Sequence, residues 1–270
     1  MSPGRPTPLG RVVSAARRRT PYAVHGLIRA ATDRSQLARR TVARLHGDLR
    51  HADVTIAHGA AAGLLMNSAD TVCGYTQGHF ESTVQDTLSA LLRPGMTVYD
   101  IGANIGFFTL IAARGVGPRG RVVALEPLPE NVRWLRHNVA LNGFDHVEVV
   151  EAAAGASDGR TAFASGDNPG WGVVSASGEF DVELIRLDDR IASGALPAPD
   201  LVKLDIEGAE IDALAGLRET LVRHAPIVIV ELHGTLEPVT AALTAAGLRI
   251  ERIDPREPDV NAHLLARPEA

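Results

Sequence analysis

Apolar segments of strand length alternate with amphipathic segments of helix length through residues 97–247. The expected strands are TVYDIG (97–102), RVVALEP (121–127), VEVVEAAAG (147–155), DLVKLDIEG (200–208) and PIVIVELHG (226–234). Repeated strand–helix alternation with largely apolar strands predicts an α/β fold whose sheet is covered on both faces. The tail, LRIERIDP to NAHLLARP, predicts two more strands joined by a polar turn, which would add one antiparallel edge strand.

The segments outside this alternation divide the chain. Residues 1–70 are expected to form an N-terminal extension, with short amphipathic helices at 9–47 and two short strands at 52–66. Residues 71–270 are expected to form the main α/β domain. Within it, residues 155–199 are too long for a bare connection and are interpreted as a strand-containing insertion.

Charge is distributed unevenly along the chain. Residues 1–50 carry eleven arginines against Asp33 and Asp48, a net charge of +9, so the rest carries −14 of the total of −5. Solvated helix faces explain the basic segment better than an anionic partner does. Aromatic residues make up 4% of the chain and do not interleave with the arginines, so nucleic acid is not expected as a partner.

Three further features of the sequence bear on the cellular compartment of the protein. No apolar run approaches the roughly 18 residues of a membrane span, and the first twenty residues lack the apolar core of a secretory signal. The one cysteine, Cys73, excludes an internal disulfide and has no evident base beside it for a catalytic role. We therefore expect a cytoplasmic protein. The strands at 52–66 and the basic helices could mediate a homodimer.

The most informative motif is VYDIGANIGFFT (98–109), a strand that leads through a glycine turn into a helix. Such a turn lets a ligand approach the backbone closely and offers it the free N–H groups of the helix N-terminus. Gly102 and Gly106 are spaced G-x-x-x-G, whereas a nicotinamide dinucleotide prefers G-x-G-x-x-G. Glu126 ends the next strand, where a carboxylate can accept both hydroxyls of a ribose.

VYDIGANIGFFTL, VVALEP, DLVKLDIEGAEIDAL and IVIVELH together resemble the FkbM family of S-adenosylmethionine (SAM)-dependent methyltransferases, over residues 74–265. The resemblance implies a class I methyltransferase fold, Rossmann-like and doubly wound. Its sheet would have seven mostly parallel strands, of which the last is antiparallel. It also implies methyl transfer, usually to a hydroxyl on a natural product or sugar.

The resemblance also implies which residues hold the cofactor. The glycine turn would cradle the methionine part, Glu126 would hold the ribose, and Glu81 fits a family glutamate near the cofactor or a simple helix-start acid. The adenine contacts would come from the Ala153–Ala154 backbone or Asp158. The predicted cofactor-binding residues are Glu81, Asp100, Gly102, Asn104, Gly106, Glu126, Ala153 and Asp158.

Ligands of open α/β sheets bind at the carboxyl ends of the strands, which places the remaining polar residues of the strand ends near the cofactor. The predicted catalytic residues are His233, Asp205 and Lys203, the only lysine in the chain. His233 has the pKa of a general base, with Asp205 as the rival. Lys203 would act as a positive clamp, because the acids Asp205 and Glu207 beside it should raise its pKa.

The acceptor and the metal are less constrained. Residues predicted to contact a hydroxylated acceptor are Trp171, Tyr75, His79, Glu207 and Glu231. A Mg²⁺ requirement is not favoured, and its ligands would be Asp205, Glu231 and His233. A nicotinamide-dependent oxidoreductase, or a cofactor-binding module without activity, are the alternative functions.

Overall fold

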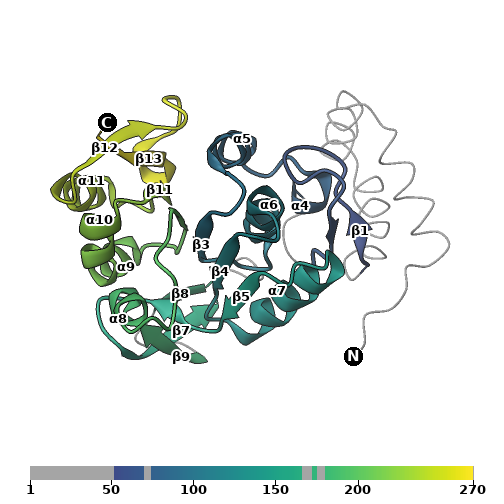
Figure 1. The fold of residues 1–270 in the computed structure, drawn as a ribbon, viewed down its shortest axis with the longest axis horizontal. Helices are drawn as coiled ribbons and strands as arrows, with labels where there is room; N and C mark the ends of the chain where they lie inside the picture. The colour runs from purple at the N-terminus through teal and green to yellow at the C-terminus, as the bar shows by residue number, and fades with distance from the viewer. Residues whose placement is uncertain (1–51, 70–73, 166–171, 175–179, 270) are drawn as a thin grey trace, which may run out of the picture. The chain divides into compact units, whose positions relative to one another are not determined.

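The computed structural model describes residues 52–69, 74–165, 172–174 and 180–269. The chain divides into two compact units, Met1–Phe80 and Glu81–Ala270 (Figure 1). The helices expected at 9–47 lie outside the described residues. Among the helices that the structure describes, none is both long and apolar enough to cross a membrane.

The first unit contains the two short strands expected at 52–66, β1 (Val54–Thr55) and β2 (Leu65–Met66), which pair in antiparallel fashion. A single helical turn, α4 (Gly74–Gln77), follows them. Tyr75 is buried there against Phe80, with ring centroids 4.6 Å apart. The ring of His79 stacks on that of His58, with 5.1 Å between centroids.

The second unit is built on a seven-stranded sheet, as predicted. Its strands, in spatial order, are β12 (Leu248–Arg252), β13 (His263–Pro268), β11 (Ile227–Glu231), β10 (Leu201–Leu204), β3 (Thr97–Ile101), β4 (Arg121–Leu125) and β5 (Val147–Val150). The neighbours from β11 to β5 are parallel, so their carboxyl ends lie along one edge of the sheet. β13 is antiparallel to both of its neighbours, which confirms the antiparallel last strand.

The position of that antiparallel strand differs from the expectation. β13 does not lie at the edge but between β11 and β12, and β12 is the edge strand. The chain crosses through α11 (Leu236–Ala245) to β12 and then returns into the gap, where β13 bonds to a strand on each side. The return pairs His263, at the start of β13, with Glu231, at the end of β11. The start of β13 therefore lies at the edge formed by the parallel strands' carboxyl ends.

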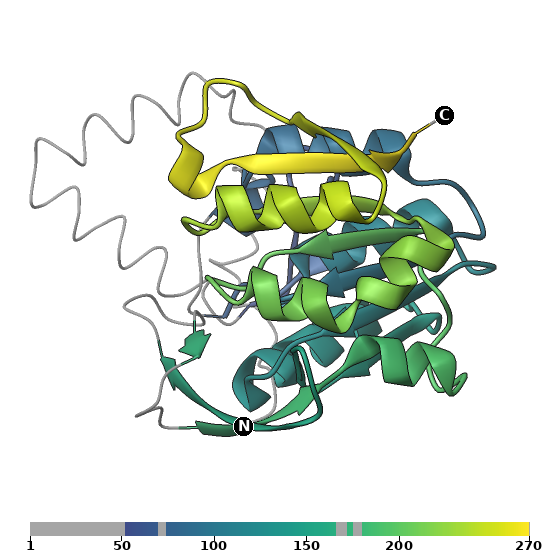
Figure 2. The ribbon, with the colours of Figure 1, turned by 90° about the vertical axis from the view of Figure 1, so that its left-hand side faces the viewer.

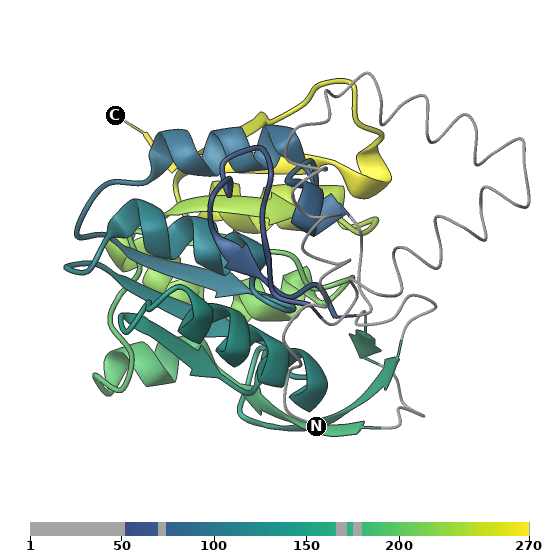
Figure 3. The same cartoon turned by 90° about the vertical axis from the view of Figure 1, so that its right-hand side faces the viewer.

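Helices cover both faces of the sheet. On one face lie α9 (Glu210–Gly216), α10 (Arg218–His224) and α11, seen in front in Figure 2. On the other lie α5 (Ser82–Leu91), α6 (Phe107–Val116) and α7 (Pro129–Leu141), seen in front in Figure 3. Alternate strand residues face each layer, so Tyr99 and Ile101 pack into one core with Leu214 of α9. Both faces are thus buried, which explains the apolar strands.

Two segments depart from the predicted elements. Residues 211–224, one of the amphipathic segments of helix length, belong to two helices rather than one, because the backbone leaves helical values at Leu217. Gly216 lies so close to Gly155 that a Cβ would be 2.0 Å from its carbonyl oxygen. The strand predicted over 147–155 also splits: β5 ends at Val150, and β6 (Ala153–Ala154) joins a separate sheet.

That separate sheet forms the predicted insertion. It has four strands, in the order β6, β9 (Phe180–Ile185), β7 (Gly159–Ser165) and β8 (Gly172–Val174), and α8 (Leu187–Ala192) follows it. A short 3-10 helix, Asp259–Asn261, precedes β13. Trp171, predicted to contact the acceptor, lies outside the described residues, as does Cys73.

Candidate active site

The glycine turn between β3 and α6 adopts left-handed backbone angles at Gly102 (φ 84°), Asn104 (φ 51°) and Gly106 (φ 97°). Glycine takes such angles without strain, whereas Asn104 must be held in place by its surroundings. A Cβ on Gly102 would lie 1.8 Å from the carbonyl oxygen of Asp205. The glycine at 102 is therefore required by the close approach of the turn to the chain after β10.

Gly102→Ala is expected to lower the free energy of unfolding by more than the roughly 1–3 kcal/mol of a left-handed non-glycine residue, because the backbone of Asp205 must also move. Gly143→Ala is the matched control, since Gly143 also has a positive φ (65°) but its Cβ would meet nothing within 4 Å. Chemical denaturation of both variants measures the difference. Equal losses would show that the contact with Asp205 is unimportant.

Glu126, the residue after β4, is hydrogen-bonded to the glycine turn. Its buried carboxylate accepts hydrogen bonds from the backbone N–H of Asn104 (2.9 Å), the backbone N–H of Leu128 (3.0 Å) and the side chain of Asn131 (3.1 Å). Burial raises the pKa of Glu126 to about 7, although these three hydrogen bonds act to lower it. Glu126 thus supports the shape of the turn, a role that the sequence did not reveal.

Asp100, near the end of β3, is buried beside the same turn. One carboxylate oxygen, Oδ2, accepts a hydrogen bond from Thr109 of α6 at 2.5 Å. The other, Oδ1, is also buried but makes no hydrogen bond with any residue that the structure describes. A buried carboxylate oxygen without a hydrogen bond is unfavourable in free energy. A cationic group of a bound ligand would remove this cost, so Asp100 is a candidate for binding such a group.

Lys203, the third of the four residues of β10, is 4% exposed. Its ammonium donates a hydrogen bond to Asp205 Oδ2 at 3.0 Å and lies 4.5 Å from the centroid of the Phe108 ring. Burial alone would lower the pKa of Lys203, but the negative charges of Asp205, Asp100 and Glu81 outweigh it and raise the pKa. The predicted direction of the pKa shift is confirmed, but the acids that act beside Asp205 are Asp100 and Glu81 rather than Glu207.

In the strand expected over 200–208, the alternate residues Lys203, Asp205 and Glu207 would share one face. The strand ends at Leu204, and Glu207 takes a left-handed conformation (φ 52°), so Glu207 turns away from Lys203 toward His233. Its carboxylate lies 3.3 Å from Nε2 of His233. Lys203 and Asp205 nevertheless meet, because the chain after the strand brings the carboxylate back to the ammonium.

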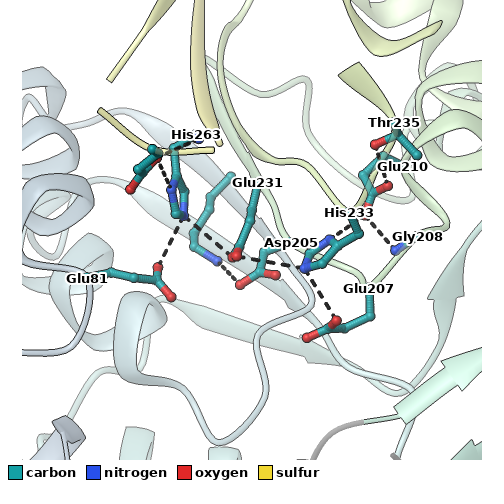
Figure 4. A network of polar contacts seen from close by, with 11 residues as sticks. Glu81, Asp205, Glu207, Gly208, Glu210, Glu231, His233, Thr235 and His263 are labelled. Carbon is teal, nitrogen blue, oxygen red and sulfur yellow. Dashed lines mark hydrogen bonds and ion pairs between the residues drawn. The ribbon is translucent and has the colours of Figure 1, made fainter. Parts of the chain in front are cut away.

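His233 lies two residues beyond β11, within a group of carboxylates (Figure 4). Its Nδ1 hydrogen bonds at 2.9 Å to Glu210, whose fully buried carboxylate also accepts bonds from Gly208 N–H and Thr235 Oγ1. Burial would lower the pKa of His233, but the bond to Glu210 and the charges of Glu207 and Glu231 raise it to about 9. His233 therefore carries a proton near neutral pH, which disfavours it as the general base.

Glu231 lies between two histidines, and sequence reasoning missed the second. Oε1 of Glu231 is 3.7 Å from His233 Nε2, and Oε2 is 3.5 Å from Nε2 of His263 (Figure 4). Burial raises the pKa of Glu231 to about 7. His263 was overlooked because its place opposite Glu231 depends on the insertion of β13 between two strands. Glu210 lies in the motif EGAE (207–210) together with Glu207, and this second acid is the sequence signal that indicates it.

Other predicted site residues are distributed as follows. Ala153 packs against the cluster of Leu128 and Val182, and Leu128 is two residues after Glu126, which is compatible with the predicted adenine side. Asp158 is engaged elsewhere: its carboxylate accepts a bond from Arg186 N–H at 2.7 Å and pairs with Arg190 at 3.0 Å. Their cofactor contacts remain predictions. Tyr75 and His79 belong to the first unit, and their acceptor contacts are likewise predictions.

The seven-stranded sheet with its antiparallel last strand, and the glycine turn and acids at the strand ends, define a class I methyltransferase fold. The chain belongs to the methyltransferase FkbM domain family, whose model matches residues 100–250. This match runs from Asp100 within β3 to Ile250 within β12, so it includes the strand-end acids Asp100, Glu126, Asp205 and Glu231.

Individual relatives agree with this family. The hexuronic acid methyltransferase AglP of Haloferax volcanii is 30% identical over 174 residues, which cover 62% of this chain and 70% of that protein. The 2-O-methyltransferase NoeI of Sinorhizobium fredii is 28% identical over 50% of this chain and 63% of its own length. The solved structure of methyltransferase FkbM from Methylobacillus flagellatus KT has a TM-score of 0.50 and 25% identity, and covers 66% of this chain. The chain spans 45% of that structure.

Proposed function

We propose that this methyltransferase uses S-adenosylmethionine to methylate a hydroxyl group of a small molecule, such as a sugar or a natural product. The observation that carries the proposal is the buried Oδ1 of Asp100, which lacks a hydrogen bond among the described residues and adjoins the glycine turn. An ammonium group, such as that of the cofactor's methionine part, would satisfy it. The names of AglP and NoeI support a sugar-like or hydroxyl acceptor.

The residues present fit the cofactor at two points. Asp100 would accept the ammonium, and Glu126 would accept hydroxyls of the ribose, while it keeps the turn in place through Asn104. The backbone N–H groups at the start of α6 face the same turn, and no side chain of the N-cap residue, Gly106, occupies them. When bound, the cofactor supplies a methyl group that is already activated for transfer.

The chain's own contribution is chiefly alignment, which can supply roughly 7–11 kcal/mol of the barrier reduction. We assign Asp205 as the acceptor for the hydroxyl proton, with Lys203 fixing its carboxylate at 3.0 Å. His233, held through Nδ1 by Glu210, would orient the acceptor by donating from Nε2. Glu207 and Glu231, which flank Nε2 of His233, would line the acceptor side.

Asp205→Asn is expected to lower kcat by about 10²–10⁴-fold, because the amide cannot take the proton, while affinity for S-adenosylhomocysteine stays near that of the wild type. Steady-state kinetics and isothermal titration calorimetry measure the two quantities. Asp212→Asn, a change in α9 outside the cluster, is the control. An unchanged kcat in Asp205→Asn would remove Asp205 from the catalytic residues.

The cofactor itself is tested by thermal unfolding with candidate ligands. A ligand at 100 times its Kd should add roughly 2.7 kcal/mol of stability. We expect S-adenosylhomocysteine to stabilise the protein and NADH to leave it unchanged. Methyl transfer is then measured by mass spectrometry with a panel of neutral and acidic sugars and hydroxylated natural products. Stabilisation by NADH alone would contradict the proposal, and cofactor binding without any product would favour a binding module.

A further inference from the structure

We propose that Glu81, Glu231 and His263 form a binding site for a divalent cation. The three residues come from the N-cap of α5, the end of β11 and the start of β13 (Figure 4). One donor atom of each lies within 4.8 Å of the other two. The proposal concerns cation binding by the chain alone, so it does not depend on the cofactor or on the acceptor.

The distances suit ligands of one ion better than hydrogen-bonded partners. Nε2 of His263 lies 3.6 Å from Glu81 Oε2 and 3.5 Å from Glu231 Oε2, which is longer than an ordinary hydrogen bond. Two ligands that are each about 2.1–2.4 Å from a cation, and at right angles, are about 3.0–3.4 Å apart. Small rotations of the side chains would therefore bring all three donor atoms into coordination range.

Two of the donor atoms are buried and have no hydrogen bond. Nε2 of His263 and Oε2 of Glu81 each lack a hydrogen-bond partner among the residues that the structure describes. The whole His263 residue is only 6% exposed, and its Nε2 points between the two carboxylates (Figure 4). Buried polar atoms are nearly always bonded, whereas these two have only ion pairs of 3.5–3.6 Å, so a cation bound in place of the imidazole proton would satisfy both.

His263 is also oriented as metal-binding histidines are. Its Nδ1 lies 3.0 Å from Glu257 Oε2, which also accepts the backbone N–H of His263 at 2.9 Å. A carboxylate on one ring nitrogen fixes the tautomer and directs the other nitrogen toward the metal. The contact with Glu257 leaves Nε2 as the donor atom toward Glu81 and Glu231.

The local charge favours a cation at this position rather than beside Asp205. Asp205, Glu231 and His233 also form a compact set, as the sequence predicted for a metal. In that set, however, Asp205 is already paired with the ammonium of Lys203 at 3.0 Å, and His233 already faces Glu207 at 3.3 Å. Among the ion pairs of the described residues, Glu81 has His263 alone. A cation bound by Glu81 would therefore displace no lysine ion pair, although the charge of Lys203 also acts on Glu81.

The test is binding of Mn²⁺, which accepts both carboxylate and imidazole ligands, to the full-length protein after dialysis against EDTA. Electron paramagnetic resonance of free Mn²⁺ gives the affinity and the stoichiometry, without cofactor or acceptor. We expect one ion per chain. Glu81→Gln and His263→Gln should each weaken binding at least tenfold, and Glu257→Gln about 10–100-fold, because it loses the orientation of His263.

Exposed residues provide matched controls: Glu237→Gln and His224→Gln should bind Mn²⁺ like the wild type. Circular dichroism checks that each variant is folded. If His263→Gln does not fold, the nearly isosteric Glu81→Gln still tests the proposal. The proposal is overturned if the wild type binds no Mn²⁺, since the three residues then form only ion pairs. It is equally overturned if Asp205→Asn abolishes binding while Glu81→Gln and His263→Gln retain it.

Discussion

Lys203→Met is expected to lower the free energy of unfolding by about 3–5 kcal/mol, which is the cost of removing one partner of a buried ion pair. Methionine keeps most of the volume and the contact with Phe108, so the loss reports the charge. Without the ammonium, the carboxylate of Asp205 loses its hydrogen bond of 3.0 Å, and Asp100 loses the positive charge of Lys203, which lowers its pKa. Chemical denaturation monitored by circular dichroism measures the change.

Two comparisons make this prediction specific. Lys203→Met combined with Asp205→Asn should recover part of the lost stability, because the uncompensated charge is then removed as well. Arg136→Met breaks an exposed pair with Glu151, whose side chains are 55% and 42% exposed, and should cost no more than about 1 kcal/mol. If Lys203→Met were as mild as Arg136→Met, the buried pair of Lys203 and Asp205 would contribute no more to stability than an exposed ion pair does.

Glu126→Gln is expected to weaken binding of S-adenosylhomocysteine by at least about 30-fold, equivalent to roughly 2 kcal/mol. An amide has one acceptor oxygen, so it cannot bond to Asn104 N–H and Leu128 N–H at once and also receive a ribose. The lost hydrogen bonds should also lower stability by about 1–3 kcal/mol. Isothermal titration calorimetry gives the affinity, and thermal unfolding without ligand gives the stability.

Glu130→Gln is the control for this variant, since Glu130 is an exposed acid in the first turn of α7. It should change neither affinity nor stability appreciably. A loss of stability in Glu126→Gln with unchanged affinity would mean that Glu126 only supports the glycine turn. The ribose contact implied by the family resemblance would then be wrong for this chain.

The fold followed from local patterns in the sequence. Apolar strands separated by amphipathic helices predicted the sheet and its two covering layers, because a strand that is buried on both faces consists mainly of apolar residues. The acids Asp100, Glu126, Asp205 and Glu231 were placed together for a similar reason, since parallel strands end at one edge. Errors occurred where the chain turned within an apparently continuous pattern, as at Leu217 and after Val150.

The active-site partners depended on contacts between distant segments. The ordinary pKa of histidine predicts His233 as the base, but three surrounding carboxylates raise that pKa to about 9. The strand-end position of Glu126 likewise predicts only a ribose ligand, whereas its carboxylate also holds the glycine turn. In each case the chemistry depends on neighbours that no spacing along the chain indicates.

The sequence by itself determined the order of strands and helices, the glycine turn and the acids at the strand ends, because these are encoded by periodicity and by short motifs. Only the tertiary structure decided that β13 inserts between β11 and β12, and thereby that His263 faces Glu231 and Glu81. The order of the strands within the sheet, and the side chains that this order brings together, depend on pairing between segments far apart in the chain. Their energies depend on the whole sheet, so no local stretch of sequence specifies them.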